Sequence, residues 1–343
     1  MRILQIHNYY ATRGGECGVV DAEKQLLESL GHEVLQYARD SGELSDYSII
    51  EKSYSYWNIP YNPRIERDLV NYVKQSNPDV AHVHNVFPLL TPAVYIALEK
   101  SKIPVIQTVH NFRFLCPNGT FFIDGKVCER CQEKGYFQAI RHRCMRNSLV
   151  TSAQYARAIT RLWKSRILTG YIDRYIALNN FSKNKLSAGG IPPDKIEICG
   201  NFATRLVDEL QTKEDYCLYL GRLSAEKGIN TLINAARELT SCRIKIAGSG
   251  PLEGEIRAAT SSIENMEFLG YVSGEQKNEQ VARARALVVP SEWYENFPVS
   301  IVESMSLGTP VIASRIGGLP EMVDDGHSGM FFDAGNMSEL SAC

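Results

Sequence analysis

Residues 290–303 read PSEWYENFPVSIVE and follow a short apolar run, Ala286–Val289. The apolar run is typical of a buried parallel strand, and Pro298 suits the first position of a helix, where its missing N–H costs nothing. The N-terminus of such a helix attracts anions, phosphate above all. The amides that we expect to face a phosphate belong to Phe297, Val299 and Ser300.

Two carboxylates frame this stretch, because Glu295 lies in the expected loop and Glu303 in the expected helix. One interpretation is structural: Glu295 caps a turn and Glu303 is a solvated helix residue. The other is functional: Glu295 binds sugar hydroxyls and Glu303 binds a ribose. The motif Glu-x7-Glu, after Pro-Ser and before GTPVIA at 308–313, resembles the donor-site signature of retaining glycosyltransferases of family 4. The resemblance covers residues 2 to about 333.

This resemblance implies an α/β fold of the GT-B type, with two Rossmann-like domains facing a cleft. The alternation of strand-like and helix-like patterns independently favours parallel sheets covered by helices. We expect strands at 2–7, 33–37, 79–84, 103–109, 174–178, 217–220, 243–247, 267–269, 286–289 and 311–313. We expect helices at about 18–30, 64–76, 91–101, 152–170 and 181–188.

The domain boundary is expected within the linker 199–215, which becomes polar and charged towards its end. Residues 1–202 would form an acceptor-side domain with a cysteine-rich insert at 112–146. Residues 203–343 would form the domain that binds the nucleotide sugar. Members of the family usually continue with further helices, so we expect the second domain to be truncated at Cys343.

Length, charge and hydropathy exclude several classes of protein. The 343 residues suffice for two cores, and the net charge of −2 argues against general nucleic-acid binding. No apolar run approaches the roughly 20 residues that cross a bilayer. The apolar part of the N-terminus is too short for a signal peptide, so we expect this stretch to form a first strand instead. We therefore expect a cytoplasmic protein, at most peripheral on the inner face of the cell membrane.

Four of the nine cysteines cluster in the sequence. Cys128 and Cys131 form a Cys-x2-Cys pair, flanked by Cys116 and Cys144, and such a set can complete a tetrahedral thiolate site. The sequence favours a closed structural zinc site over free or redox-active cysteines, which remain the alternative. We expect no catalytic metal.

A basic segment follows, with ten Lys and Arg against two acidic residues between Arg130 and Arg174, an excess of +8. Within it, residues 151–169 have the pattern of a helix in which apolar side chains alternate with arginines. Such a helix can lie on an anionic membrane, or it can face the core with a solvated basic side. The apolar residues are Tyr155, Ile159, Leu162, Trp163 and Ile167.

Cations and histidines mark further strand ends. LGRLSAEKG at 220–228 ends a strand and carries Arg222 and Lys227, which suit a diphosphate, with a surface pair as the alternative. His84 and His110 each end a buried strand, where ligands bind in open α/β sheets, although most such histidines are structural. The resemblance places His110 near the donor sugar. It assigns the nucleotide site to Gly14, Gly15, Gly248, Gly250, Tyr271, Asn296, Phe297, Pro298, Val299 and Glu303.

The resemblance implies a hexosyltransferase that moves a sugar, with retention, from a nucleotide-diphosphate sugar of the UDP or GDP type. The acceptor would be a hydroxyl of a glycan or of a polyprenyl-linked molecule, in polysaccharide or glycolipid assembly. His110, Arg222, Lys227 and Glu295 would be the catalytic residues. The alternatives are a nucleotide-sugar epimerase on the same fold, or a truncated relative that binds nucleotide without catalysis.

Overall fold

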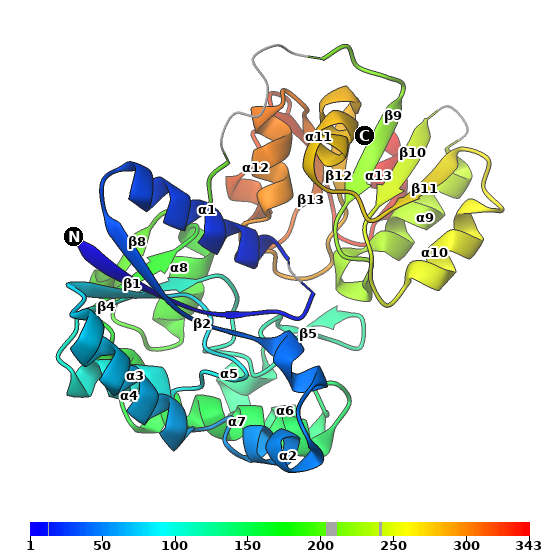
Figure 1. Cartoon of the computed structure of the whole chain (residues 1–343). Coiled ribbons are helices and arrows are strands. Elements are labelled where there is room, and N and C mark those ends of the chain that lie inside the picture. Colours follow the sequence, from blue (N-terminus) through cyan, green and yellow to red (C-terminus); the bar gives the residue numbers. More distant parts are fainter. Residues whose placement is uncertain (13, 204–210, 240–241) are drawn as a thin grey trace. The chain divides into compact units, whose positions relative to one another are not determined.

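A computed structural model describes residues 1–12, 14–203, 211–239 and 242–343 (Figure 1). The chain forms two compact units. Unit 1 contains residues 1–121 and 129–200, and unit 2 contains residues 122–128 and 201–343. Part of the expected linker, 204–210, lies outside the described residues. The division into separately folding domains at 202/203 stays a prediction.

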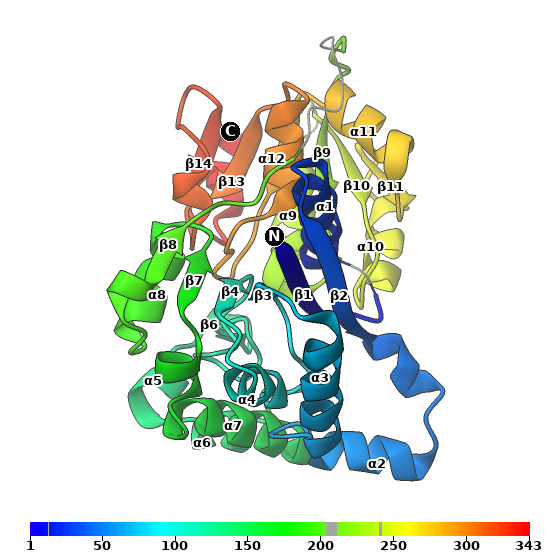
Figure 2. The same cartoon turned by 60° about the vertical axis from the view of Figure 1, so that its left-hand side comes forward.

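The core of unit 1 is a six-stranded, all-parallel sheet in the order β2-β1-β3-β4-β7-β8 (Figure 2). Its central strands are almost continuous runs of buried side chains, as expected for a sheet covered on both faces. The strands are β1 (Arg2–Tyr9), β2 (Glu33–Asp40), β3 (Val80–Val83), β4 (Val105–Val109), β7 (Arg174–Ala177) and β8 (Ile196–Ile198).

Side-chain caps mark the start of four helices of unit 1, namely α2, α3, α7 and α8. In α3, the Asn62 side chain accepts from the Arg64 amide, Pro63 occupies the first turn, and Asn77 ends the helix in the left-handed region. The helices are α1 (Gly15–Ser29), α2 (Ile49–Trp57), α3 (Pro63–Ser76), α4 (Ala93–Lys100), α5 (Arg130–Lys134), α6 (Phe137–Arg141), α7 (Leu149–Lys164) and α8 (Asn180–Ala188). Both views show α2, α6 and α7 side by side (Figures 1 and 2).

Unit 2 repeats this architecture with a parallel sheet in the order β11-β10-β9-β12-β13-β14. Leu218, Ile246 and Leu287, from three of its strands, are fully buried. The strands are β9 (Tyr216–Leu220), β10 (Arg243–Ala247), β11 (Met266–Gly270), β12 (Ala286–Val289), β13 (Val311–Ser314) and β14 (Gly329–Phe332). The helices are α9 (Ile229–Glu238), α10 (Glu253–Thr260), α11 (Gly274–Arg283), α12 (Val299–Ser306) and α13 (Met337–Ala342), and a short hairpin pairs β5 (Phe122–Ile123) with β6 (Lys126–Val127).

The strand order of each sheet reverses at one point. In unit 1 the chain passes from β1 to β2 on one side and returns to β3 on the other side of β1. In unit 2 it passes from β9 to β10 and β11, and returns to β12 on the other side of β9. Ligands of open α/β sheets bind at such switch points, outside the carboxyl ends of the strands. Ligand-binding residues are therefore expected in the loops after β1, β3, β9 and β12.

Several expected element boundaries differ from the structure by a few residues, and two of these differences concern α7 and α12. The helix expected at 152–170 spans 149–164, and a π-helical turn follows at Ile167–Tyr171 because Arg166 takes the left-handed conformation. Pro298 is the residue before α12, with ψ near 120°, and not its first helical residue. The first turn of α12 therefore begins at Val299.

Candidate functional site

In unit 2, an ion pair lies at the switch point of the sheet. Lys227 follows β9, Glu295 follows β12, and the Lys227 Nζ lies 2.6 Å from Oε1 of Glu295. The Ser291 hydroxyl donates to the same carboxylate oxygen at 2.6 Å. The Glu295 side chain is only 5% exposed, whereas that of Lys227 is 24% exposed. The structure thus brings together two of the expected catalytic residues.

The loop after β9 and the loop after β12 are held against each other by their backbones. Gly228 has a φ of +66°, and a Cβ there would lie 1.7 Å from the Pro290 carbonyl oxygen. The Glu292 amide donates to the Glu226 carbonyl at 3.0 Å. Only glycine at position 228 permits this close approach of the two backbones. The approach holds Lys227 beside the loop that follows β12. Trp293 lies under Lys227, with Nζ 5.0 Å from the ring centroid.

The predicted glycines of this unit also serve close backbone contacts. A Cβ on Gly248 would lie 1.8 Å from the Gly221 carbonyl oxygen, and one on Gly250 would lie 2.4 Å from the Leu223 carbonyl oxygen. The Gly248 amide donates to the Gly270 carbonyl at 2.8 Å. These close backbone contacts explain why glycine is required at positions 248 and 250. Contact of the two glycines with a nucleotide stays a prediction.

Glu303 pairs with a residue that the sequence did not indicate. The Lys277 Nζ on α11 lies 2.6 Å from Oε1 of Glu303 on α12, and both side chains are about one-fifth exposed. The two helices therefore present one carboxylate and one ammonium together. Lys277 has no motif around it, so only the packing of α11 against this region could reveal it.

The other predicted nucleotide residues differ in exposure. Arg222 is exposed, and its carbonyl accepts a hydrogen bond from the Tyr219 hydroxyl at 2.7 Å. Tyr271 is 70% exposed, whereas Asn296 is buried. The Phe297 carbonyl accepts a hydrogen bond from the Asn201 side-chain amide at 2.9 Å, which holds the chain just before α12. Whether these residues bind nucleotide stays a prediction.

In unit 1, a pocket lies at the carboxyl ends of β3 and β4. His84 and His110, which the sequence singled out, both line it, and the His84 Nδ1 lies 3.0 Å from Nε2 of His110. Burial, with the nearby His7 and His82, lowers the pKa of His110 to about 3. Burial likewise lowers the pKa of His84 well below its usual range. Both imidazoles are therefore neutral at physiological pH.

A carboxylate missed by the sequence analysis lies beside Gly14 and Gly15, which are exposed. Burial raises the pKa of Glu16 to about 7, although its hydrogen bonds and the nearby Arg113 oppose that shift. The Glu16 Oε2 accepts from the Tyr10 hydroxyl at 3.1 Å and from the Asn111 amide at 3.3 Å. Glu16 thus titrates near neutral pH, a property typical of functional sites.

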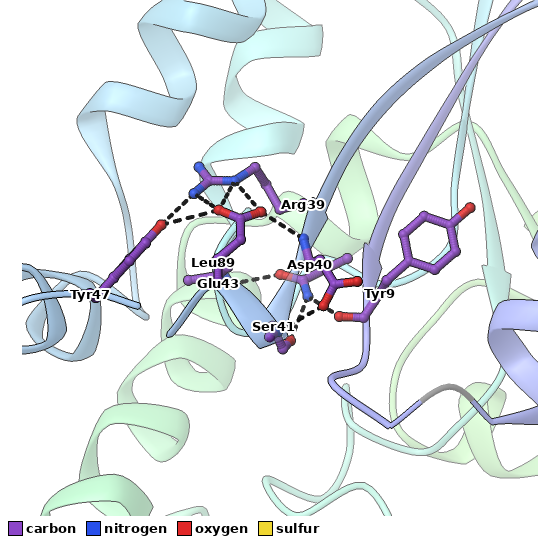
Figure 3. Close-up of polar contacts among 9 residues, drawn as sticks. Tyr9, Arg39, Asp40, Ser41, Glu43, Tyr47 and Leu89 are labelled. Atoms are coloured by element: carbon purple, nitrogen blue, oxygen red, sulfur yellow. Dashed lines mark hydrogen bonds and ion pairs between the residues drawn. The ribbon is translucent and has the colours of Figure 1, made fainter. Parts of the chain in front are cut away.

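Polar contacts brace the neighbouring strand ends (Figure 3). Arg39 Nε lies 3.1 and 3.0 Å from the two carboxylate oxygens of Glu43. The Asn8 amide donates to the Ser41 hydroxyl at 2.9 Å, and its side-chain carbonyl accepts from the Leu89 backbone amide at 2.8 Å. These bonds tie the ends of β1 and β2 to the loop after β3, which supports the pocket.

The cysteines expected to bind zinc are divided between the two units. Cys116, Cys131 and Cys144 belong to unit 1, and Cys128 belongs to the segment grouped with unit 2. None of them forms a disulfide, among the residues that the structure describes. Burial raises the pKa of Tyr136 above its usual range, and the nearby Cys131 and Cys116 add to this rise. These two thiols therefore share one neighbourhood, and zinc binding stays a prediction.

The amphipathic membrane interpretation of the basic helix is not supported by its packing. Tyr155, Ile159, Leu162 and Ile167 are buried in unit 1, so their apolar surface is not available to lipid. The Trp163 indole donates to the Phe114 carbonyl at 2.8 Å. This helix is a core helix with a solvated basic side. In the described ranges, moreover, we find no helix with the length and hydropathy that a bilayer crossing requires.

Both halves of the chain match models of known protein families. Residues 14–203 match the family model described as Glycosyltransferase Family 4, and residues 204–342 match that described as Glycosyl transferases group 1. The chain is 24% identical to an uncharacterised glycosyltransferase of Methanocaldococcus jannaschii, over 99% of this chain and 86% of that protein.

Two solved structures share the fold over nearly the whole chain. A sucrose-phosphate synthase of Thermosynechococcus elongatus superposes with a TM-score of 0.69 at 18% identity, covering 99% of this chain and 88% of that one. The Anabaena protein HepE, in complex with UDP-glucose, superposes with a TM-score of 0.66 at 16% identity, covering 100% and 88%.

Proposed function

The chain belongs to glycosyltransferase family 4, and from this premise we propose that it transfers a hexose, with retention, from a nucleotide-diphosphate sugar to an acceptor hydroxyl. Its two parallel sheets are Rossmann-like, as in glycosyltransferases of the GT-B type. The observation that carries the proposal is the Lys227–Glu295 ion pair at the switch point of unit 2.

We assign the donor diphosphate to the loop that holds Lys227. The Lys227 ammonium is partly exposed and lies at the carboxyl end of a parallel sheet. It can therefore exchange its carboxylate partner, Glu295, for a phosphate of the donor. The N-terminus of α12 adds amide donors and a favourable dipole. In this arrangement Glu295 binds sugar hydroxyls, Glu303 binds the ribose, and Arg222 shares the diphosphate charge with Lys227.

The reaction that fits these residues is a front-face displacement. The bond between the sugar and the diphosphate breaks as the acceptor oxygen bonds to the same face of the sugar, and the leaving diphosphate takes the acceptor proton. Catalysis then consists of positioning and of neutralising the charge that grows on the diphosphate. No protein nucleophile is needed. His110, as a neutral imidazole, orients the sugar and phosphate groups.

The donor nucleotide is proposed to be of the UDP or GDP type. The proposal is supported by HepE, which shares the fold and whose crystal structure is a complex with UDP-glucose. A thermal-shift screen with UDP-glucose, GDP-mannose, ADP-glucose and dTDP-glucose identifies the donor before any assay of transfer. The same donor incubated alone distinguishes transfer from epimerisation, since an epimerase converts it without an acceptor.

The first prediction concerns Lys227. We expect Lys227→Ala to change donor affinity only a few-fold and to lower turnover by about 100-fold to 1,000-fold, because a charge that acts mainly in the transition state is removed. Donor binding is measured by calorimetry and turnover by nucleotide release. Arg257→Ala, in an exposed ion pair on α10, is the control and leaves both unchanged. Equal losses in binding and turnover would contradict the role given to Lys227.

We further propose that the acceptor is a glycan or polyprenyl-linked molecule reached at the cytoplasmic face of an anionic membrane. The buried side of α7 does not serve this purpose. Instead, Phe137, Leu149 and Val150 are 67%, 48% and 57% exposed around the turn between α6 and α7. Exposed arginines lie in and beside the same turn, namely Arg141, Arg143 and Arg146. Exposed apolar side chains among arginines suit an anionic lipid surface.

A further inference from the structure

A carboxylate and two imidazoles converge between α1 and the sheet of unit 1. His82 lies on β3 and His84 follows two residues later, so both side chains point to the same side of the sheet. Glu23 comes from α1, and its Oε1 lies 2.5 Å from Nδ1 of His82. One ligand atom from each of the three residues lies within 4.8 Å of the others.

One nitrogen of this cluster lacks a hydrogen-bond partner. The His84 side chain is 0% exposed, and no group among the described residues forms a hydrogen bond with its Nε2. This nitrogen lies 3.9 Å from Oε1 of Glu23. A buried polar atom without a partner is costly and uncommon in folded proteins, and a bound metal ion would remove that cost by accepting the nitrogen lone pair.

We propose that Glu23, His82 and His84 bind a divalent transition metal of the zinc class. Two imidazole nitrogens and one carboxylate are a ligand set that such ions accept, with water in a fourth position. The three atoms need only small movements, because tetrahedral ligands lie about 3.3 Å apart when each is about 2 Å from the ion. The Glu23 side chain is 18% exposed and gives the ion a path from solvent.

The other nitrogen of each histidine has a partner that would orient the ring. The His82 Nε2 lies 2.7 Å from the Thr108 hydroxyl, and the His84 Nδ1 lies 3.0 Å from Nε2 of His110. Metal-binding histidines usually have such a partner, which fixes the tautomer. To bind the ion through Nδ1, the neutral His82 ring carries its proton on Nε2 and donates it to the Thr108 hydroxyl, which leaves Nδ1 and the Glu23 carboxylate available as ligands.

The proposed ion has a consequence for the pocket. With the His84 Nε2 bound to the metal, the proton of His84 is on Nδ1 and is donated to Nε2 of His110. The proton of His110 is then on its own Nδ1. The metal therefore acts as a positioning element for His110, and this site is distinct from the cysteine cluster, which would supply thiolate ligands only.

Cobalt(II) distinguishes the two sites, because thiolate ligands add intense charge-transfer bands in the near ultraviolet and imidazole and carboxylate ligands do not. We expect the purified protein, titrated with Co²⁺, to develop visible d–d absorption that survives in Cys128→Ser, whereas any thiolate charge-transfer bands weaken in that variant. We expect Glu23→Gln to weaken this cobalt binding at least 10-fold, and Thr108→Val to weaken it about 10-fold to 100-fold.

The controls separate metal binding from folding. Glu28→Gln changes an exposed carboxylate on the same helix and leaves the cobalt spectrum unchanged. Far-ultraviolet circular dichroism checks that each variant is folded, and Glu23→Ala, which removes the carboxylate without adding an amide, replaces Glu23→Gln if that variant unfolds. The proposal is overturned if Cys128→Ser shows no d–d absorption, or if folded Glu23 variants bind Co²⁺ as the wild type does.

Discussion

Glu16 shows how its surroundings change one side chain. It follows Gly15 on α1, and three polar neighbours surround its carboxyl group, namely Tyr10, Asn111 and Arg113. Burial nevertheless dominates and raises its pKa to about 7. Glu295 has a different neighbour, because its Oε1 lies 2.6 Å from Nζ of Lys227. Two glutamates of one chain thus have different partners, because different segments of the fold surround them.

The second prediction is a pH dependence of stability that depends on Glu16. Since its pKa is higher in the folded than in the unfolded chain, its contribution to stability is fully present below about pH 4.5 and is lost as the pH rises through about 7. We expect the free energy of unfolding of the wild type, relative to Glu16→Gln, to fall by about 1–3 kcal/mol between pH 4.5 and 8.

Urea denaturation of both proteins at several pH values measures this difference. Glu28→Gln serves as the control, because an exposed carboxylate on the same helix gives a nearly constant difference. A flat profile for Glu16→Gln would mean that the carboxyl group is solvated and ionises normally in the folded protein.

Among the elements, α7 shows that one sequence pattern fits two environments. Its apolar residues recur at helical spacing and alternate with arginines, which suits both a membrane surface and a protein core. In the fold, Ile159 and Leu162 are 0% exposed, so this face of the helix packs into the core. The apolar side chains that remain exposed lie at the start of α7 and on α6, where helical periodicity gives no signal.

The third prediction concerns this surface between α6 and α7. We expect the protein to co-sediment with vesicles that contain phosphatidylserine, and less with phosphatidylcholine alone, because arginines attract anionic headgroups. Phe137→Ser should weaken this binding by about 10-fold to 100-fold, since burial of one aromatic side chain contributes about 1.5–3 kcal/mol. Leu26→Ser, at an exposed apolar residue of α1, is the control. Binding that ignores the anionic lipid content would exclude this surface.

For the whole molecule, two separate cores have a thermodynamic consequence. Each sheet is enclosed by its own helices, and the clusters around Leu218 and Ile246 belong wholly to unit 2. A ligand that binds only one unit stabilises that unit directly. Because the donor nucleotide is assigned to Lys227 and Glu303, its binding should raise the free energy of unfolding of unit 2.

The fourth prediction is measured by differential scanning calorimetry. We expect UDP or GDP, whichever the thermal-shift screen selects, to raise the unfolding temperature of one transition by about 2–4 °C per kcal/mol of binding energy, at about 100 times its dissociation constant. Fluorescence of Trp293, beside Lys227, should report the same transition. Lys227→Ala keeps this shift if its charge acts mainly in turnover. A shift without any change around Trp293 would place the nucleotide elsewhere.

The sequence by itself determined the elements and the family. Buried runs such as 286–289 and 243–247 coincide with β12 and β10, because a strand covered on both faces must be largely apolar. The Glu-x7-Glu motif likewise indicated the glycosyltransferase family. The local patterns did not reveal α2, and they placed Pro298 inside the helix instead of before it.

Only the tertiary structure determined which charged residues pair with each other. Lys227 and Glu295 are 68 residues apart, and Lys277 and Glu303 are 26 residues apart, yet each pair meets at 2.6 Å. Glu23 and Glu16 have no motif of their own, and their chemistry arises from the strands and helices that surround them. The physical reason is that periodicity and capping act over a few residues, whereas ion pairing, burial and pKa depend on which distant segments the sheet order brings together.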